Sequence, residues 1–372
     1  MKFTILQQDF LPKLQSVSRS VGVRSTLPVL DNILLSVAGS PRGEAGKKLK
    51  IAATNLEIGV IKYLPIEGGE DGEITIPAKT IVELISGLDQ SKVELATTGE
   101  GLTVSSGKLK AFINGIPASE FPAIPLSEEK GISFSKEALQ ECSGILFASA
   151  VDEGRPVLTG ILTEAKDDKL DFVATDGFRL AHRQVALPKG SPQFKSLIPR
   201  RTFEEVLRIM GEEEAEEIKI ATTENQNQVI FSLGTTIVSS RLIEGQFPAW
   251  EKIIPASSVA RVAVDKEEFL RAIKLAAVFT KNEANILVLN TQKNLLKLKS
   301  FAKELGSQEN EIEAEVAGEI EVAFNTRFLQ EVISNAPSTQ VSIEFSGPLS
   351  ASLIKPIGVE GLEYIVMPVR LS

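Results

Sequence analysis

The sequence is built from one structural plan that recurs three times. Each third begins with a short strand-like run, followed by apolar residues at spacings of three and four, which places them on one face of a helix. These apolar sets are Phe10, Leu14, Val17 and Val21, then Leu139, Cys142 and Leu146, then Phe269, Ile273 and Ala276. A recurrence roughly 120 residues long predicts three similar domains rather than the short units of a solenoid.

A second helix is predicted in each third, and it always starts directly after a strand-like run. The three starts lie at residues 76–80, 198–202 and 323–326. Alternating runs that end in turn residues lie between the two helices and predict strands and hairpins. Phe-Pro-Ala at residues 121–123 and again at 247–249 ends the first two copies. We therefore predict domains at 1–125, 126–255 and 256–372, each an α+β fold of two helices covering about eight short antiparallel strands.

Composition sets the class of protein but not its function. With 372 residues, of which 43% are hydrophobic, the chain is long enough for two or three compact cores. No apolar run reaches about 18 residues, and the N-terminus lacks the pattern of a signal peptide, so we expect a cytoplasmic protein with no membrane partner. The single cysteine, Cys142, excludes an intrachain disulfide and a multi-cysteine metal cluster, and its apolar neighbours predict a core position.

Residues that could carry catalysis are scarce. The one histidine, His182, lies in a strand-like run, where we predict a structural role. No phosphate-binding loop, dinucleotide fingerprint, nucleophile elbow or zinc-binding histidine pair occurs. Acidic residues at 212–217 predict a solvated loop, and those at alternate positions from 309 to 315 predict the wet face of a strand. We expect no catalytic residue, metal or cofactor, although a phosphoryl-transfer or hydrolytic enzyme with a convergent carboxylate or nucleophile site remains the alternative.

Positive charge collects on the predicted helices although the net charge is −9. Residues 10–30 carry Lys13, Arg19 and Arg24 and no acid. The later helices carry Arg200, Arg201, Arg208, Arg271, Lys274 and Lys281. If equivalent helices face a common side, these cations could meet duplex phosphates without reading bases. Solvated helix faces with long aliphatic stems are the alternative interpretation.

Four segments together resemble the family of bacterial sliding clamps, the beta subunits of DNA polymerase III. They are residues 24–32, residues 175–181 with the sequence Thr-Asp-Gly-Phe-Arg-Leu-Ala, residues 247–248, and residues 364–371 with the sequence Tyr-Ile-Val-Met-Pro-Val-Arg-Leu. The likeness runs the length of the chain. It implies three domains of the clamp fold and a non-catalytic processivity factor for DNA replication.

The resemblance also implies a head-to-tail homodimeric ring. Duplex DNA passes through such a ring without sequence specificity, the helices line the hole and the sheets form the outside. By this resemblance Arg24, Arg155, Arg200 and Arg201 are candidates for contact with duplex DNA. Val278 and Phe279 correspond to the family's apolar subunit contact, which would meet the facing subunit near Ile113. An ATP-driven clamp loader would place the ring on primed duplex.

The family binds its partners, among them the catalytic subunit of DNA polymerase III and other clamp-motif proteins, through a short peptide with glutamine first and an apolar or aromatic residue near its end. The peptide enters a pocket between the second and third domains. Carried over by position, that pocket comprises Leu158, Thr175, Gly177, Phe178, Arg179, Leu180, Pro248, Ile253, Asn325, Phe328, Leu349, Ile365, Val366, Met367, Pro368, Val369 and Arg370.

The residue types fit such a pocket, with two departures from the family pattern. Gly177 permits a tight Asp-Gly turn, and Met367 supplies an adaptable apolar wall. Phe178 stands where many members carry histidine, and the loop at residues 155–157 lacks the aromatic residues of some members. A monomeric peptide-binding adaptor, which would keep the pocket but form no ring, is a further alternative.

Overall fold

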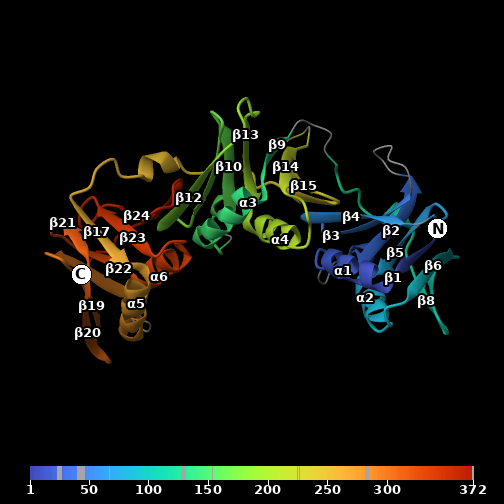
Figure 1. Cartoon of the computed structure of the whole chain (residues 1–372), viewed down its shortest axis with the longest axis horizontal. Coiled ribbons are helices and arrows are strands. Elements are labelled where there is room, and N and C mark those ends of the chain that lie inside the picture. Colours follow the sequence, from blue (N-terminus) through green and yellow to red (C-terminus); the bar gives the residue numbers. More distant parts are fainter. Residues whose placement is uncertain are drawn as a thin grey trace. The chain divides into compact units, whose positions relative to one another are not determined.

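The computed structural model describes residues 1–22, 27–39, 47–66, 68–126, 131–152, 154–223, 225, 227–280 and 285–370 (Figure 1). They form two compact units. Unit 1 comprises Met1–Lys136 and Arg201–Leu242, and unit 2 comprises Glu137–Arg200 and Ile243–Ser372. The strands fall into three repeats, β1 to β8, β9 to β16 and β17 to β25, so the second repeat contributes to both units.

Unit 1 contains two antiparallel sheets. The smaller has the order β1 (Lys2–Leu6), β6 (Lys92–Thr98), β7 (Gly101–Ser106) and β8 (Leu109–Asn114). The larger has the order β5 (Gly72–Pro77), β2 (Asn32–Gly39), β3 (Lys47–Thr54), β4 (Ile58–Ile66), β16 (Thr236–Arg241), β15 (Gln228–Leu233), β14 (Glu217–Thr222) and β9 (Ile132–Ser135). The pairing of β4 with β16, in which Ile61 lies opposite Ile237, joins the first repeat to the second.

The helices of unit 1 bury the apolar faces that their spacing predicts. Helix α1 (Gln7–Ser18) buries Phe10, Leu14 and Val17, and it packs on α2 (Ala78–Ser86) and on β3 and β4. Helix α4 (Arg200–Met210) buries Phe203, whose ring meets Phe231 of β15 edge to face. Periodicity alone was sufficient to place these three helices.

Unit 2 also contains two antiparallel sheets. The larger has the order β13 (Phe194–Pro199), β10 (Gly160–Lys166), β11 (Lys169–Thr175), β12 (Arg179–Ala186), β25 (Leu362–Val366), β24 (Ser352–Pro356), β23 (Gln340–Phe345), β17 (Ala260–Asp265) and β21 (Glu315–Ala317). The smaller has the order β20 (Gly306–Glu313), β19 (Leu295–Ala302), β18 (Ile286–Gln292) and β22 (Glu321–Asn325). The pairing of β12 with β25 joins the second repeat to the third.

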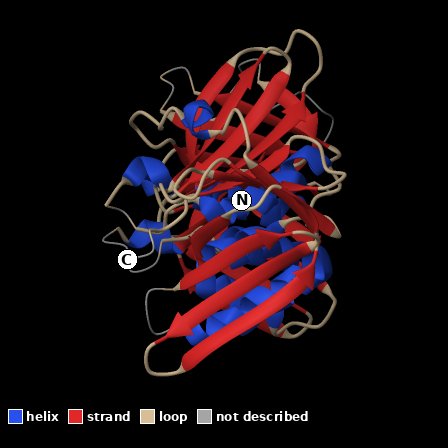
Figure 2. Ribbon diagram, turned by 90° about the vertical axis from the view of Figure 1, so that its left-hand side faces the viewer, coloured by secondary structure: helices blue, strands red, loops and turns tan. Residues whose placement is uncertain are grey.

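Helices α5 (Lys266–Thr280) and α6 (Thr326–Asn335) pack on each other, and α5 covers β18, β19 and β20. Figure 2 shows helices lying behind the strands that face the viewer. The amphipathic helix predicted through Leu146 differs: α3 (Lys136–Cys142) ends early and continues as the 3-10 helix η3 (Ser143–Ala148). Ser143 and Gly144 have low helix propensity, which accounts for the break.

The predicted fold class is confirmed. In the part of the chain that the structure describes, the first and second repeats each hold two α-helices and eight strands, and the third holds two α-helices and nine strands. None of the described helices is long and apolar enough to cross a membrane. The domain boundaries near residues 125 and 255 stay a prediction.

Candidate functional site

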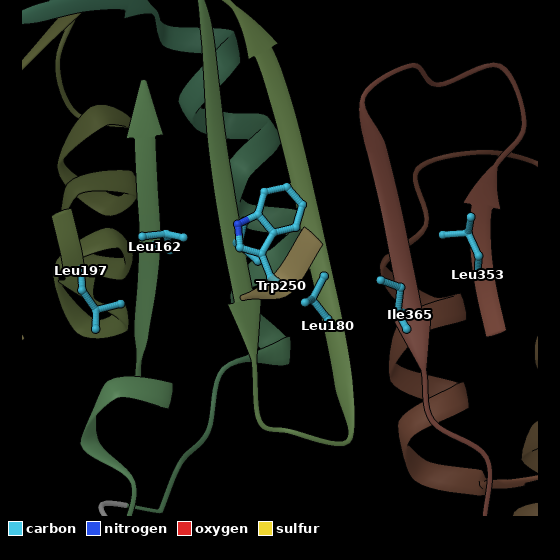
Figure 3. Packing of buried hydrophobic residues seen from close by; sticks show 7 residues of the cluster. Leu162, Leu180, Leu197, Trp250, Leu353 and Ile365 are labelled. Carbon is cyan, nitrogen blue, oxygen red and sulfur yellow. The ribbon is translucent and has the colours of Figure 1, made fainter. Parts of the chain in front are cut away.

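Leucine and isoleucine side chains from two repeats form an apolar floor beside the β12–β25 pairing. Leu180 and Ile365 lie opposite each other in this ladder, and the indole of Trp250, from the 3-10 helix η5 (Trp250–Ile253), lies over the sheet (Figure 3). The other buried members of the floor are Leu162, Val173, Leu197 and Leu353. Ile253 packs against it. Three residues predicted for the pocket, Leu180, Ile253 and Ile365, therefore share one apolar cluster.

The turn between β11 and β12 is closed by its own side chains. The Thr175 hydroxyl donates to the Arg179 carbonyl at 2.6 Å and accepts from the Gly177 N–H at 3.0 Å. Asp176 Oδ1 accepts from the N–H groups of Phe178 and Arg179. Gly177 has a φ of +91°, in the region where L-residues are strained. The turn is thus formed by local hydrogen bonds before any ligand arrives.

The first repeat contains the same turn. Comparing the two turns shows which features belong to the repeated fold and which are particular to the second repeat. Thr54 donates to the Ile58 carbonyl and accepts from the Leu56 N–H, and Asn55 Oδ1 accepts from the N–H groups of Glu57 and Ile58. Leu56 has a φ of 73°. The turn itself is therefore part of the repeated fold. What differs is Arg179, whose place in the first repeat is taken by Ile58.

Arg179 is a buried cation with partners from both repeats. Its Nε lies 3.1 Å from Asp176 Oδ2, and its Nη1 lies 2.5 Å from Glu331 Oε2 of α6. Its Nη2 donates to the Phe147 carbonyl at 3.0 Å. The guanidinium also lies 5.1 Å from the ring centre of Phe147 and 4.8 Å from that of Phe328. Arg179 therefore joins η3 of the second repeat to α6 of the third.

Glu331 keeps its negative charge at this junction. Burial disfavours the charged carboxylate, but hydrogen bonds from Arg327 and Arg179 and their positive charges outweigh that effect and hold the pKa of Glu331 below its ordinary value. Asn325, a predicted pocket residue, caps α6 by accepting from the N–H groups of Arg327 and Phe328. The cap fixes the start of the helix that carries Phe328 and Glu331.

The segment after β25 is docked by backbone hydrogen bonds. The Met367 N–H donates to the Phe178 carbonyl at 2.9 Å, and the Val369 N–H donates to the Ala323 carbonyl at 2.8 Å. Pro368 between them is half-buried. The tail thus links the turn of the second repeat to β22 of the third.

The predicted pocket residues fall into three groups by exposure. Leu158, Thr175, Arg179, Leu180, Ile365 and Val366 are buried, whereas Ile253, Asn325, Phe328, Pro368 and Val369 are half-buried. The exposed rim consists of Gly177, Phe178, Pro248, Leu349, Met367 and Arg370. The contacts above bring residues 175–180, 365–369 and Phe328 together. That Pro248, Leu349 and Arg370 face the same pocket stays a prediction.

The candidates for DNA contact do not have a common environment. Arg24 lies outside the described residues. Arg155 is exposed, but its Nη2 donates to the Asp176 carbonyl at 3.1 Å, so its guanidinium rests on the turn described above. Arg200 is half-buried at the start of α4, and Arg201 beside it is exposed. Arg208, farther along α4, is neutralised by ion pairs with Glu205 and Glu212.

The residues predicted for the subunit contact differ in exposure. Val278 on α5 is 63% exposed, Leu275 one turn earlier is exposed too, and Phe279 is half-buried. Ile113 on β8, by contrast, is only 7% exposed, whereas its neighbour Phe112 is 56% exposed. Successive residues of a strand point to opposite faces, so a one-residue shift exchanges a buried side chain for an exposed one. The exposed apolar side chain next to Ile113 is therefore that of Phe112, and the contact near Ile113 stays a prediction.

His182 has the structural position that its strand-like run predicts, but its partners were not foreseen. Its ring nitrogens lie 2.7 Å from Asp171 Oδ1 and 2.9 Å from Glu363 Oε1, and its ring lies 4.4 Å from that of Trp250. Burial disfavours the imidazolium, but the hydrogen bonds and charges of the two carboxylates outweigh it and raise the pKa of His182. The histidine therefore links the second and third repeats.

The acidic run after α4 is not simply a solvated loop, because one of its members, Glu213, is buried. The buried ammonium of Lys62 on β4 lies 3.0 Å from Glu212 Oε2 and 3.2 Å from Glu213 Oε1. Glu213 also accepts from Thr236 and lies 3.6 Å from Lys13. Burial disfavours its charged form, but these partners hold the pKa of Glu213 below its ordinary value. Sequence gave no signal for a partner 150 residues away.

Cys142 is fully buried, as its apolar neighbours predict, and burial raises the pKa of its thiol. The alternating glutamates of β20 are exposed, as predicted, and Glu309 and Glu311 each pair with Lys297. Among the described residues, no three histidine, cysteine, aspartate or glutamate side chains are grouped as metal ligands.

Comparisons with known proteins agree with this geometry. Models of the DNA polymerase III beta subunit match the chain with the N-terminal domain at residues 1–125, the central domain at 135–249 and the C-terminal domain at 251–370. The beta sliding clamps of Synechococcus elongatus and Synechocystis sp. are 33% and 31% identical, with all of both chains covered in each case.

Solved structures give the same result for the fold. The crystal structure of the DNA polymerase III subunit beta from Pseudomonas aeruginosa superposes with a TM-score of 0.92 at 28% identity, and all of both chains is covered. The DNA polymerase sliding clamp from Bacillus subtilis superposes with a TM-score of 0.91 at 25% identity, again over all of both chains. The chain therefore belongs to the family of DNA polymerase III beta subunits, the bacterial sliding clamps.

Proposed function

We propose that this chain is a processivity factor for DNA replication, which forms a ring-shaped homodimer around duplex DNA and tethers polymerase and repair proteins. The observation that carries the proposal is a repeated strand pairing. The last strand of the run β2-β3-β4 pairs with the last strand of the second repeat, β16, and the last strand of β10-β11-β12 pairs with the last strand of the third repeat, β25. One rule thus joins each repeat to the next.

The same pairing rule predicts which two strands would join one chain to another. In the third repeat β20 corresponds to β4 and β12, and in the first repeat β8 corresponds to β16 and β25. Both are end strands of their sheets within the described residues. An unpaired edge is a template for another strand. Pairing β20 of one chain with β8 of a second, twice, closes a head-to-tail dimer of six repeats.

Charge supports this pairing. Lys108 and Lys110 are exposed at β8, and Glu309, Glu311 and Glu313 are exposed along β20. Opposite charges on facing surfaces favour one register and disfavour the pairing of two identical edges. The exposed apolar residues Phe112 and Val278 would add the buried centre of the contact.

Weak contacts between arginine side chains and DNA phosphates suit a ring that slides along the duplex. Arg200 and Arg201 at the start of α4, together with Arg24 and Arg155, are our candidates for these contacts, which would be weak and salt-dependent. The net charge of −9 leaves only such local basic groups to meet DNA. The hydrogen bond from Arg155 to Asp176 indicates that Arg155 also belongs to the pocket.

The pocket beside the β12–β25 pairing is the proposed site for the peptide of each partner. Its apolar floor is buried, its turn is preformed, and its rim exposes Phe178, Leu349 and Met367. Exposed apolar side chains around a hollow are typical of an interaction site. Partners would include the clamp loader, the catalytic subunit of DNA polymerase III and other clamp-motif proteins.

The role of a processivity factor also has consequences for catalysis, cofactors and location. The chain would catalyse no reaction, hold no cofactor and act in the cytoplasm, with domains divided near residues 125 and 255. Encirclement is tested on DNA: a loader-assembled ring should stay on a nicked circle and run off once the circle is linearised. Equal retention on circular and linear DNA would refute a ring.

A further inference from the structure

The one histidine of the chain and its one tryptophan are in contact beside the apolar floor. His182 lies on β12, and its ring centre is 4.4 Å from that of Trp250, with an angle of 46° between the planes. Trp250 is a buried member of the floor and belongs to η5, the segment that also carries Ile253 (Figure 3). The histidine is therefore one contact away from the proposed peptide pocket.

The imidazole of His182 is held from both sides by carboxylates of the neighbouring strands. Its Nε2 lies 2.7 Å from Asp171 Oδ1 on β11, and its Nδ1 lies 2.9 Å from Glu363 Oε1 on β25. A neutral imidazole has one N–H and one lone pair, so it can donate to only one of these carboxylates, whereas an imidazolium donates to both. The arrangement of the two carboxylates therefore fits the protonated ring.

The indole of Trp250 is held by packing and by its contact with the imidazole. Its N–H is buried and finds no hydrogen-bond partner among the residues that the structure describes. Contact between a cation and an indole ring is favourable, and it strengthens when the pair is shielded from water. Trp250 and His182 are only 8% and 7% exposed. A positive charge on His182 therefore stabilises the indole in its position over the floor.

The charges around the histidine favour its protonated form. Burial opposes the charge, but the two carboxylates outweigh burial and raise the pKa of His182. Arg183, the next residue along β12, projects from the opposite face of the sheet, where it pairs with Glu141. The other charged groups on the elements packed around His182 are Glu164 of β10 and its partner Lys195 of β13, Lys355 of β24, and Glu251 and Lys252 of η5. The two carboxylates in direct contact with the ring therefore dominate its charge state.

We propose that His182 is a positioning residue of the peptide pocket, whose protonated ring holds the indole of Trp250 over the apolar floor. The inference rests on the proposed function, because it assumes that a partner peptide binds against this floor. It deepens that function by linking a proton to peptide binding: the protein with a protonated His182 has the indole in place and binds the peptide more tightly. Because the coupling between two ligands is reciprocal, the bound peptide also raises the affinity of His182 for its proton.

The first measurement needs no peptide, because the fluorescence of the single tryptophan reports on the single histidine. An imidazolium in contact with an indole quenches its fluorescence more strongly than a neutral imidazole does. The tryptophan fluorescence of the full-length protein should therefore rise as pH increases above about 6.5. His182→Gln should abolish this rise.

Three further variants keep the histidine and test what sets its charge. Asp171→Asn and Glu363→Gln should each move the rise in fluorescence to lower pH, because each removes a negative charge that favours the imidazolium. The matched control is Glu344→Gln, which removes a carboxylate from β23 of the same sheet, two strands away from Glu363. It should leave the rise where it is in the unaltered protein.

The second measurement tests the link to the pocket. Isothermal calorimetry with a glutamine-leucine-type peptide should show an affinity that falls roughly two- to tenfold as pH rises through the fluorescence transition. The peptide is capped at both ends and has no titratable side chain, so its own charge stays constant. His182→Gln should bind this peptide with an affinity that does not change over the same range of pH.

A tryptophan fluorescence that does not change with pH, or that changes equally in His182→Gln, would overturn the proposal. So would a peptide affinity that has the same pH profile in the unaltered protein and in His182→Gln, because the histidine would then not act on the pocket, although the pocket itself would stand. If the peptide binds neither protein at any pH, the assignment of the pocket fails, and the inference fails with it.

Discussion

The guanidinium of Arg179 lies 4.8 Å from the ring centre of Phe328, which links β12 of the second repeat to α6 of the third. Two carboxylates, Asp176 and Glu331, balance the charge of Arg179. Neither repeat could form this arrangement alone. The proposed pocket beside it would therefore depend on a contact between repeats as well as on the apolar floor.

Replacing Arg179 should weaken both the pocket and the protein. Arg179→Met leaves Asp176 without its cationic partner and removes the support of Phe328. Because both carboxylates are partly exposed, we expect a loss of about 1–3 kcal/mol in the free energy of unfolding, measured with urea. Arg179→Lys should recover little, because an ammonium cannot replace the planar fork that holds two carboxylates and two rings. Unchanged peptide affinity in both variants would contradict this role.

His182 should contribute to the pH dependence of the protein's stability. The pKa of His182 is raised in the folded state, so its stabilisation is present below the unfolded value of about 6.5 and is lost as pH rises through the folded pKa. The melting temperature should therefore fall as pH rises above about 6.5. His182→Gln should reduce this fall. The partners that set the effect are Asp171, which also accepts from Gln184, and Glu363.

Since His182 is the only histidine in the chain, the difference between the unaltered protein and His182→Gln isolates its titration from that of other groups. A difference between the two melting temperatures that stays constant from pH 6 to pH 9 would show that the histidine does not titrate in this range.

The buried ammonium of Lys62 should be among the most sensitive positions of unit 1. Lys62→Met removes a partner of the buried Glu213, and breaking such a pair costs about 3–5 kcal/mol. The double variant Lys62→Met with Glu213→Gln should recover part of that loss, because no uncompensated charge is left. Lys79→Met is the control: Lys79 is exposed, so we expect a change within about 0.5 kcal/mol. Urea unfolding measures all three.

Local sequence patterns were sufficient to predict the helices and the turn at Thr175. The apolar spacing of α1, α2, α5 and α6 and the Asp-Gly pair of the turn depend on neighbours within a few residues. Such signals can be read directly from a sequence. The break after Cys142 was missed because the apolar spacing continues through it, although Ser143 and Gly144 favour a break.

Non-local contacts account for what the sequence did not predict. The partners of Lys62 come from the second repeat, and two partners of Arg179, Phe328 and Glu331, come from the third. A run of acids gives no sign that one member, Glu213, will be buried. The exposures of Ile113 and Phe112 have another origin, since both residues are apolar and only the strand register decides which one faces out. The repeat itself, by contrast, was evident from sequence and led to the strand-pairing rule.

The edge strands provide the last prediction. Phe112→Asp or Val278→Asp places a charge in the proposed subunit contact, where it would be buried without a partner, and such burial costs several kcal/mol. Each variant should be a monomer at micromolar concentration by light scattering, whereas the unaltered protein should be a dimer. The folded chain should persist, because both side chains are exposed in the isolated subunit. Val151→Asp, at another exposed valine, should remain a dimer. A monomeric unaltered protein would favour the adaptor over the ring, and a dimeric Val278→Asp variant would place the contact elsewhere.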